Sequence, residues 1–229
     1  MHKRLNIKYI GKNRNDWITE HCTDKHVIHI GCTDSMMTHN HLKSGQFLHE
    51  ILTKNSHSVI GLDIDRAGIQ FMKKSLKYDN VMFGDAERLS KFIHKRFDVI
   101  VACDVIEHFN NPGLFFSEAK KCLLQNEGGM IILSFPNSLS LKNIVSAIIR
   151  RKETNHPNHV SCYSPMCIEE ICRRWNYKVN GWVGYTWSKK AIENKLGNFM
   201  PEIVIKITKN GYLAQGIGCI LSINKEYNV

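Results

Sequence analysis

The sequence predicts an α/β fold, a doubly wound and mainly parallel β-sheet with helices on both faces. Short apolar runs alternate along the 229 residues with longer segments of helical periodicity, and this alternation is typical of such a sheet. No repeat, low-complexity tract or Pro- and Gly-rich linker interrupts the chain, and its length suffices for one complete core. We therefore expect a single domain over residues 1–229, with an N-terminal segment at 1–24 and a cap over the active site at 136–163.

The predicted strands are apolar runs that end at turn residues or at polar residues. A parallel strand that helices cover on both faces is apolar throughout, as at residues 99–102. The predicted strands lie at 27–30, 58–62, 81–83, 97–102, 130–134, 178–184 and 216–223. No long helix separates the last two, so we expect them to pair antiparallel at one edge of the sheet.

The predicted helices carry apolar residues at intervals of three or four. Pro112 stands in the first turn of one helix, where its missing N–H is tolerated. Ser164 precedes Pro165 and is a favourable N-cap for another. The predicted helices lie at 41–54, 66–78, 112–124 and 164–175.

Composition narrows the class of protein and its partners. A formal charge of +10 favours acidic partners such as nucleic acid, anionic lipid or phosphorylated substrates, but the basic residues form no long tract, which argues against nucleic acid. No apolar run approaches the roughly 20 residues that span a bilayer, and the first residues lack the apolar core of a signal peptide. We expect a cytoplasmic protein whose eight cysteines, which form no C-x-x-C pair, are free thiols.

The segment 97–112, FDVIVACDVIEHFNNP, carries the strongest functional signal. An apolar strand stops there at Asp104, Glu107 and His108. Chemistry in parallel sheets gathers beyond the carboxyl ends of the strands. The spacing i, i+3, i+4 puts the three side chains on one side of a helical turn, so we expect an active-site edge with Asp104 and His108 as catalytic candidates.

Three other strand ends describe an adenosine site. Gly31 follows the first strand and lets the backbone approach a ligand closely. Asp63 ends the second strand, where a carboxylate suits the hydroxyls of a ribose, while Asp65 is expected to cap the next helix. Asp85 follows the third strand, where it can accept a hydrogen bond from an exocyclic amine.

The motifs VIHIGC, GLDID, GDAE, FDVIVACDVIEH and GGMIILSFPN resemble, in order and spacing, those of the class I S-adenosylmethionine-dependent methyltransferases. The resemblance covers about residues 27–175. It implies a Rossmann-like sheet of seven strands with an antiparallel last strand, and S-adenosylmethionine as the cofactor. The implied cofactor-binding residues are Gly31 and Cys32 at its amino-acid part, Asp63 and Ile64 at the ribose, Asp85 and Ala86 at the adenine, and Cys103 near the methyl group.

The first motif departs from the family pattern. His29 stands where an acid is typical, and Thr33 and Ser35 stand where glycines are typical. This departure keeps a second class of function open, a non-catalytic cofactor-binding scaffold. The presence of both Asp63 and Asp85 favours the enzyme.

The D-x-x-E-H element resembles the E-x-x-E-H element of two metal-using branches, the ubiquinone-biosynthesis O-methyltransferases and the small-RNA 2′-O-methyltransferases. The resemblance implies Mg²⁺ or Mn²⁺ held by Asp104, Glu107 and His108, with His159 as a fourth ligand. His156 is the alternative to His159. Two other interpretations remain open at this point: His108 is a general base without a metal, or the three residues only shape the loop.

The segment at 138–152 has an apolar helical face that ends in three basic residues, Arg150, Arg151 and Lys152. We expect it to cap the active site; the alternative is an interfacial helix in contact with a membrane surface. The predicted function is O-methylation of a small molecule or glycan, including phosphorylated or lipid-linked sugars, and the alternative is RNA 2′-O-methylation. The sequence names neither the acceptor nor the oligomeric state.

Overall fold

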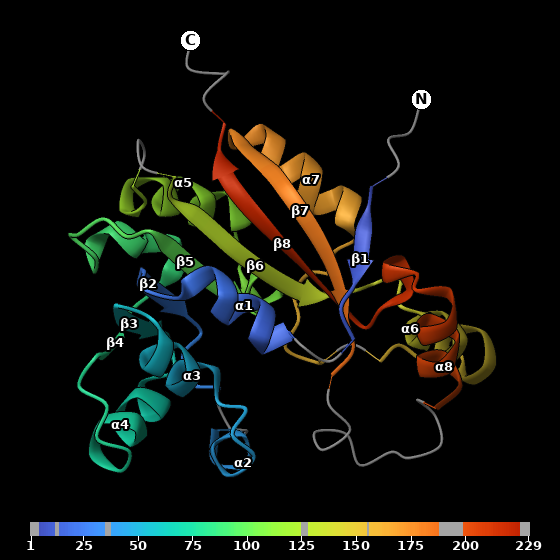
Figure 1. Cartoon of the computed structure of the whole chain (residues 1–229), viewed down its shortest axis with the longest axis horizontal. Helices are drawn as coiled ribbons and strands as arrows, with labels where there is room; N and C mark the ends of the chain where they lie inside the picture. Colours follow the sequence, from blue (N-terminus) through green and yellow to red (C-terminus); the bar gives the residue numbers. More distant parts are fainter. Residues whose placement is uncertain are drawn as a thin grey trace.

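A computed structural model describes residues 5–11, 14–34, 38–124, 128–154, 156–187 and 199–224 (Figure 1). Its strands are β1 (Ile7–Tyr9), β2 (His26–Ile30), β3 (Ser58–Asp63), β4 (Val81–Phe83), β5 (Val99–Cys103), β6 (Met130–Pro136), β7 (Tyr177–Tyr185) and β8 (Gly216–Ile223). Its α-helices are α1 (Arg14–Cys22), α2 (Thr38–Lys43), α3 (Leu48–Asn55), α4 (Arg66–Lys74), α5 (Pro112–Cys122), α6 (Leu141–Val145), α7 (Pro165–Arg174) and α8 (Phe199–Thr208). Short helical turns are η2 (Ala86–Lys91), η3 (Ile106–His108), η4 (Ser146–Arg150, a π-turn) and η6 (Gly211–Leu213).

The eight strands form one sheet in the order β1-β7-β8-β6-β5-β2-β3-β4. Strand β8 runs antiparallel to both of its neighbours, and all other pairs are parallel. The predicted fold class is confirmed, with one strand more than the expected seven. The additional strand is β1, which pairs with β7 through Ile7 and Trp182. Strand β1 also occupies the edge of the sheet, so the last two strands pair antiparallel as predicted but not at the edge, where the sequence placed them.

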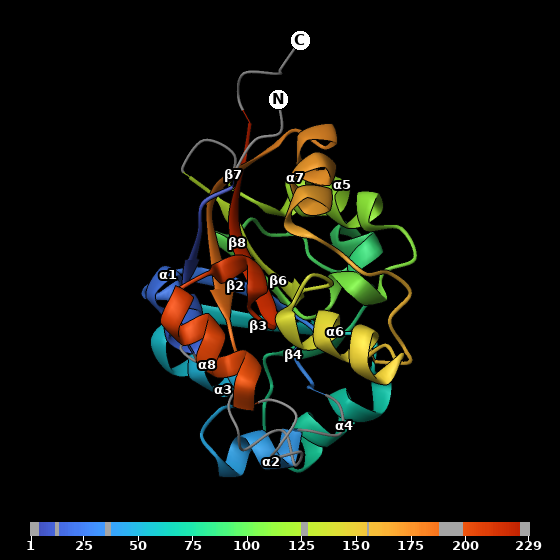
Figure 2. The same cartoon turned by 90° about the vertical axis from the view of Figure 1, so that its right-hand side faces the viewer.

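Helices cover both faces of the sheet because neighbouring residues of each buried strand point to opposite sides. Val27 of β2 packs against α1 and α3, through Ile18 and Leu52. Ile28, the next residue, belongs to the core on the other face, which α5 and α7 complete. Figure 2 shows the sheet nearly edge-on between these two helical layers.

Two predicted helices end or break where the backbone turns left-handed. The helix expected at 41–54 is divided into α2 and α3, because Gly45 adopts a φ of +67°. The helix expected at 66–78 ends at Lys74, and Lys77 has a φ of +60°. Asp65 occupies the N-cap position of α4, but its side chain makes no capping hydrogen bond.

The cap of α7 is as predicted: Ser164 Oγ accepts a hydrogen bond from the Cys167 amide at 3.3 Å. Helices α1 and α8 were not predicted from the sequence. None of the helices in the described ranges combines the length and the apolar character that crossing a bilayer requires.

Gly31 is the turn residue on which the fold depends most. Its φ is +74°, and a Cβ there would lie 2.3 Å from Cγ1 of Val105. We expect Gly31→Ala to lower the free energy of unfolding by about 1–3 kcal/mol, from the strained φ and the overlap. The matched control is Gly181→Ala, because a Cβ at Gly181 meets nothing within 4 Å. Equal midpoints for the two variants in denaturant titrations would contradict this assignment.

Candidate active site

A cavity of about 570 Å³ opens beyond the carboxyl ends of β2, β3 and β5. Most residues predicted from the sequence to form the site line it. These are Gly31, Cys32, Asp63, Ile64, Asp85, Ala86, Cys103, Asp104 and His108. Glu107 and His159 do not line it, and within 136–163 the described lining residue is Asn158.

The carboxylate of Asp63 is held rigidly at the cavity edge. Its Oδ2 accepts hydrogen bonds from the amide and the hydroxyl of Thr33, both at 2.9 Å, and its Oδ1 accepts one from the Asp65 amide at 2.9 Å. Thr33 stands where the family has a glycine, so the departure in the sequence supplies a donor that orients Asp63. Ile64 beside it is 68% exposed, which leaves an apolar wall free to pack against a flat ring.

Asp85 begins the turn η2. Its Oδ1 accepts a hydrogen bond from the Glu87 amide at 2.9 Å, which is an N-cap contact. This contact fixes the carboxylate on the cavity wall opposite the loop that follows β2. Ala86 lies next to it and is buried.

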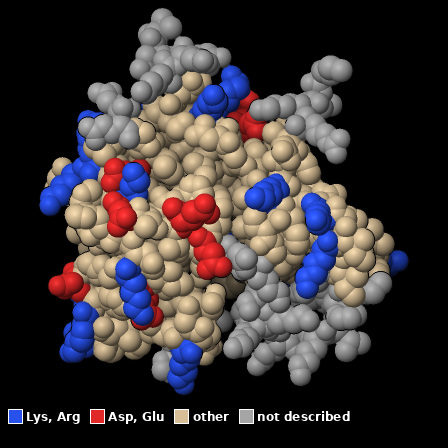
Figure 3. All heavy atoms as spheres, viewed as in Figure 1, with Lys and Arg blue, Asp and Glu red and all other residues tan. Residues whose placement is uncertain are grey.

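The cavity is acidic, although the chain is strongly basic. The carboxylates around it are Asp34, Asp63, Asp65, Asp85, Glu87 and Asp104. Arg14 is the one Lys or Arg side chain among the described lining residues. The remaining basic residues lie elsewhere, and on the face drawn in Figure 3 they are scattered. A cavity with this balance of charge favours a positively charged ligand.

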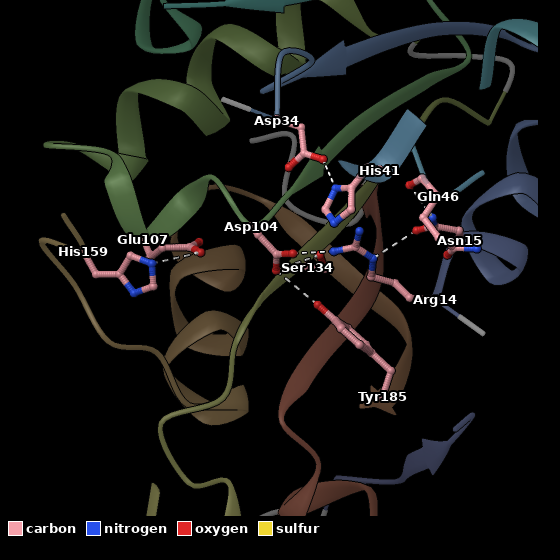
Figure 4. A network of polar contacts seen from close by, with 10 residues as sticks. All are labelled: Arg14, Asn15, Asp34, His41, Gln46, Asp104, Glu107, Ser134, His159 and Tyr185. Atoms are coloured by element: carbon pink, nitrogen blue, oxygen red, sulfur yellow. Dashed lines mark hydrogen bonds and ion pairs between the residues drawn. The ribbon is translucent and has the colours of Figure 1, made fainter. Parts of the chain in front are cut away.

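Arg14, at the start of α1, reaches the site from the N-terminal segment and forms an ion pair with Asp104 (Figure 4). The other carboxylate oxygen, Oδ1, accepts hydrogen bonds from the Tyr185 hydroxyl at 3.1 Å and from Ser134 Oγ at 3.3 Å. Burial by itself lowers the pKa of Arg14, but Asp104, Tyr185 and Cys103 together outweigh it, and the pKa lies above its ordinary value. Sequence reasoning missed Arg14 and Ser134, because no motif connects them to Asp104.

Glu107, His108 and His159 form a second cluster, in which one ligand atom of each residue lies within 4.8 Å of the others. Asp104 is not part of this cluster, because Arg14, Tyr185 and Ser134 hold its carboxylate. The predicted four-residue metal set is therefore divided between two networks. The ring of the alternative ligand His156 lies against that of His159 in a tilted arrangement, with 5.6 Å between ring centroids and 41° between the ring planes.

Glu107 is the unusual member of this cluster. It is 2% exposed, and neither carboxylate oxygen has a hydrogen-bond partner among the described residues. Burial, reinforced by the charge of Asp104, raises the pKa of Glu107 to about 9. His159 Nε2 lies 3.8 Å from its Oε1. Such an unpartnered buried carboxyl is costly unless a proton or a cation accompanies it.

The two histidines of the cluster present lone pairs. His108 Nδ1 donates to the Asn158 carbonyl at 3.1 Å, so Nε2 of the neutral ring is left as an acceptor. Burial and the neighbouring His108 and His156 lower the pKa of His159, which keeps that ring neutral. One carboxyl and two imidazoles are a donor set suited to a divalent transition metal or to proton transfer.

His29, which stands at the position of the typical acid of the first motif, is paired with His49, and both residues line the cavity. Their Nδ1 atoms lie 3.3 Å apart, so one ring donates to the other. Burial lowers the pKa of His49 to about 4 and holds that of His29 well below its ordinary value. The substitution thus replaces a charged group by a neutral hydrogen-bonded pair.

Comparisons with known proteins find similarity to methyltransferases. The family described as "Methyltransferase domain" matches residues 43–133. The ubiquinone biosynthesis O-methyltransferase of Pelagibacter ubique (strain HTCC1062) is 26% identical over 152 residues, which cover 63% of this chain and 58% of that protein. The chain thus spans less than two thirds of the length of this curated relative.

Two solved structures share the fold. A S-adenosylmethionine-dependent methyltransferase from Archaeoglobus fulgidus is 18% identical, covers 90% of this chain and 89% of its own, and has a TM-score of 0.55. A second, from Clostridium acetobutylicum ATCC 824, is 12% identical with coverages of 92% and 90% and a TM-score of 0.60.

Glu107 makes the stability of the protein depend on pH. The folded state retains a proton up to pH about 9, whereas the unfolded chain loses it near the ordinary value of 4.5. Because the native state binds the additional proton, stability falls as pH rises between these values. We expect Glu107→Gln to melt several degrees above the wild type with chelator present, by a margin that grows from pH 5 to pH 8, since each kcal/mol shifts Tm by about 2–4 °C in a domain of this size.

The control is Glu20→Gln, since Glu20 is exposed and its substitution is expected to leave Tm unchanged at every pH. A Glu107→Gln difference that is constant across this range, measured by scanning calorimetry, contradicts the protonated carboxyl.

Proposed function

We propose that the chain is a class I S-adenosylmethionine-dependent methyltransferase, and specifically a cytoplasmic O-methyltransferase of a small molecule or glycan. The observation that carries the proposal is the acidic cavity with a cluster of Glu107, His108 and His159 at its edge. The acidic cavity suits the cationic cofactor. The cluster suits an acceptor hydroxyl that must lose a proton as it is methylated.

The residues around the cavity fit the cofactor. Its sulfonium and ammonium groups are cationic, and the carboxylates around the cavity favour them over neutral nucleosides. We assign the ribose hydroxyls to Asp63 and the adenine amine to Asp85, with Ile64 against the ring. Arg14 is assigned to the carboxylate of the methionine part, because its guanidinium has donors beyond those that bind Asp104.

When bound, S-adenosylmethionine supplies a methyl group on a good leaving group, so the protein needs to align an acceptor and remove its proton. We assign proton removal to His108, whose Nε2 is free to accept. Glu107 and His159 position it from the side away from the cavity. His108 lines the cavity and Glu107 does not. We therefore assign proton removal to His108 and a positioning role to Glu107.

The same three residues also fit a divalent cation, and the unpartnered buried carboxyl of Glu107 is the observation in favour. Mg²⁺ or Mn²⁺ held by Glu107, His108 and His159 would lower the pKa of an acceptor hydroxyl. Adjacent hydroxyls, as in a catechol or a sugar diol, suit such a site because they chelate.

Removal of the Asp63 charge tests the cofactor site. We expect Asp63→Asn to weaken binding of S-adenosylmethionine roughly 10- to 100-fold in calorimetry, since hydrogen bonds to charged groups contribute about 1.5–3 kcal/mol. The control is Asp98→Asn, because Asp98 also accepts from a backbone amide, His26 N at 2.7 Å, but lies outside the cavity lining. No binding by the wild type at millimolar cofactor refutes the enzyme and the cofactor-binding scaffold together.

Replacement of His108 tests the chemistry. With labelled cofactor and catechol or sugar-diol acceptors, we expect His108→Gln to lower kcat by about 10²–10⁴-fold, as for loss of a general base, with little change in the KM for the cofactor. The exposed His57 provides the control His57→Gln, with unchanged kcat.

Mn²⁺ titration followed by electron paramagnetic resonance separates the two forms of the proposal. Binding that Glu107→Gln abolishes, together with activity lost in EDTA, supports the metal. Full activity in EDTA with no bound ion leaves His108 as the base and removes the metal.

A further inference from the structure

We propose that residues 139–152 with Val160 form a docking surface for an anionic lipid bilayer, which we call the lipid-facing surface. Its apolar members are Leu139, Ile144, Ile148, Ile149 and Val160, and its basic members are Lys142, Arg150, Arg151 and Lys152. This partner goes beyond methyl transfer, because neither the cavity nor its chemistry requires a membrane.

The apolar part of the surface is left exposed by the residues that the structure describes. Ile148 and Ile149 are each 74% exposed, and Val160 is 60% exposed. Helix α6 has no buried residue, and the buried residue of η4 is Ser146. Adjacent exposed isoleucines on a helical segment are unfavourable in water and gain free energy when they enter an apolar phase.

The basic part lies directly beside these isoleucines. Lys142, Arg150, Arg151 and Lys152 form no ion pair with another residue of the described ranges, and Glu153 is the one acidic residue between 138 and 154. Burial and the charge of Arg150 lower the pKa of Lys142. A cluster of cations with little internal compensation favours an anionic partner.

The chain holds this surface in place. Ser140 caps α6 by accepting from the Asn143 amide at 3.2 Å, and Asn143 Nδ2 donates to the Asn137 carbonyl at the end of β6 at 3.0 Å. Arg151 adopts a left-handed φ of +50° that ends the helix. Ser146 Oγ then donates to the Lys152 carbonyl at 2.9 Å, which folds the basic residues back beside the isoleucines.

The surface lies at the same edge of the sheet as the cavity. Strand β6 is parallel to β5, so α6 begins at the carboxyl edge, and Figures 1 and 2 show it there. The amides of Val160 and Ser161 donate to the Glu107 carbonyl at 3.0 and 3.2 Å. Docking through this surface therefore brings the active-site edge close to the bilayer, where an acceptor with a lipid chain is available.

The residue types favour a bilayer over a protein or a nucleic acid. Protein interfaces are enriched in aromatic residues and depleted in lysine, and this surface has no aromatic residue. Nucleic-acid surfaces combine cations with polar or stacking groups. Aliphatic residues flanked by Lys and Arg are typical of helices that lie at the interface of an anionic membrane.

The experiment uses the full chain in vesicle sedimentation at physiological salt. We expect binding to phosphatidylcholine vesicles containing phosphatidylglycerol and little binding to pure phosphatidylcholine. Arg150→Glu/Arg151→Glu is expected to lower the partition coefficient at least tenfold, since each basic residue near the surface contributes about fivefold. The control is Arg173→Glu/Arg174→Glu, which makes the same change of charge at the exposed end of α7 and is expected to bind like the wild type.

Ile148→Ser/Ile149→Ser tests the apolar part and is expected to reduce vesicle binding with an unchanged Tm, because both side chains are exposed. Calorimetry with S-adenosylmethionine is expected to give wild-type affinity for all these variants, so failure here is distinguishable from failure of the cofactor site. Three results overturn the proposal: no preference for anionic vesicles, equal binding by the Arg150/Arg151 variant, or binding of a single-stranded RNA that the same variants abolish in place of vesicle binding.

Discussion

The parallel register of β2, β3 and β5 is the constraint from which the site follows. Ile30 pairs with Leu62 on one side and with Ala102 on the other, so the three strands end at one level. The next residues, Gly31, Asp63 and Cys103, therefore meet at one edge although they lie far apart in the chain. The positive φ of Gly31 and its contact with Val105 then bring the loop after β5 against the loop after β2. A shift of one residue in either pairing would separate these groups and turn core residues outward.

Acidic and basic side chains are segregated between the cavity and the rest of the protein. The carboxylates gather around the cavity, whereas the excess of basic residues lies outside it, with Arg14 as the exception among the described lining residues. Arg14 needs Asp104, because burial disfavours an isolated guanidinium and the ion pair compensates for that cost. One consequence is structural: the N-terminal segment that contributes β1 to the sheet also closes one side of the cavity.

The active-site edge contains titratable groups that are kept neutral by burial. His29 and His49, which line the cavity, share a hydrogen bond, and Glu107 retains a proton beside the imidazole of His159, whose pKa is also lowered. Neutral buried groups avoid mutual repulsion, but each remains a potential acceptor or ligand when a proton or cation arrives. Perturbed groups of this kind cluster at functional sites, and here His29 and His49 line the cavity, while Glu107 and His159 are grouped with His108, which also lines it.

The sequence by itself determined seven of the eight strands, the strand-end residues Gly31, Asp63 and Asp85, and the D-x-x-E-H element, because each depends on local spacing along a strand or turn. It also indicated that the segment at 138–152 is apolar on one face and basic at its end. Only the tertiary structure decided that Asp104 pairs with Arg14, since that contact joins residues separated by 90 positions. The tertiary structure also decided that Asp104 belongs to a different network from Glu107 and His108, and that Ile148 and Ile149 stay exposed. Both depend on packing between distant segments, which has no signature in local sequence.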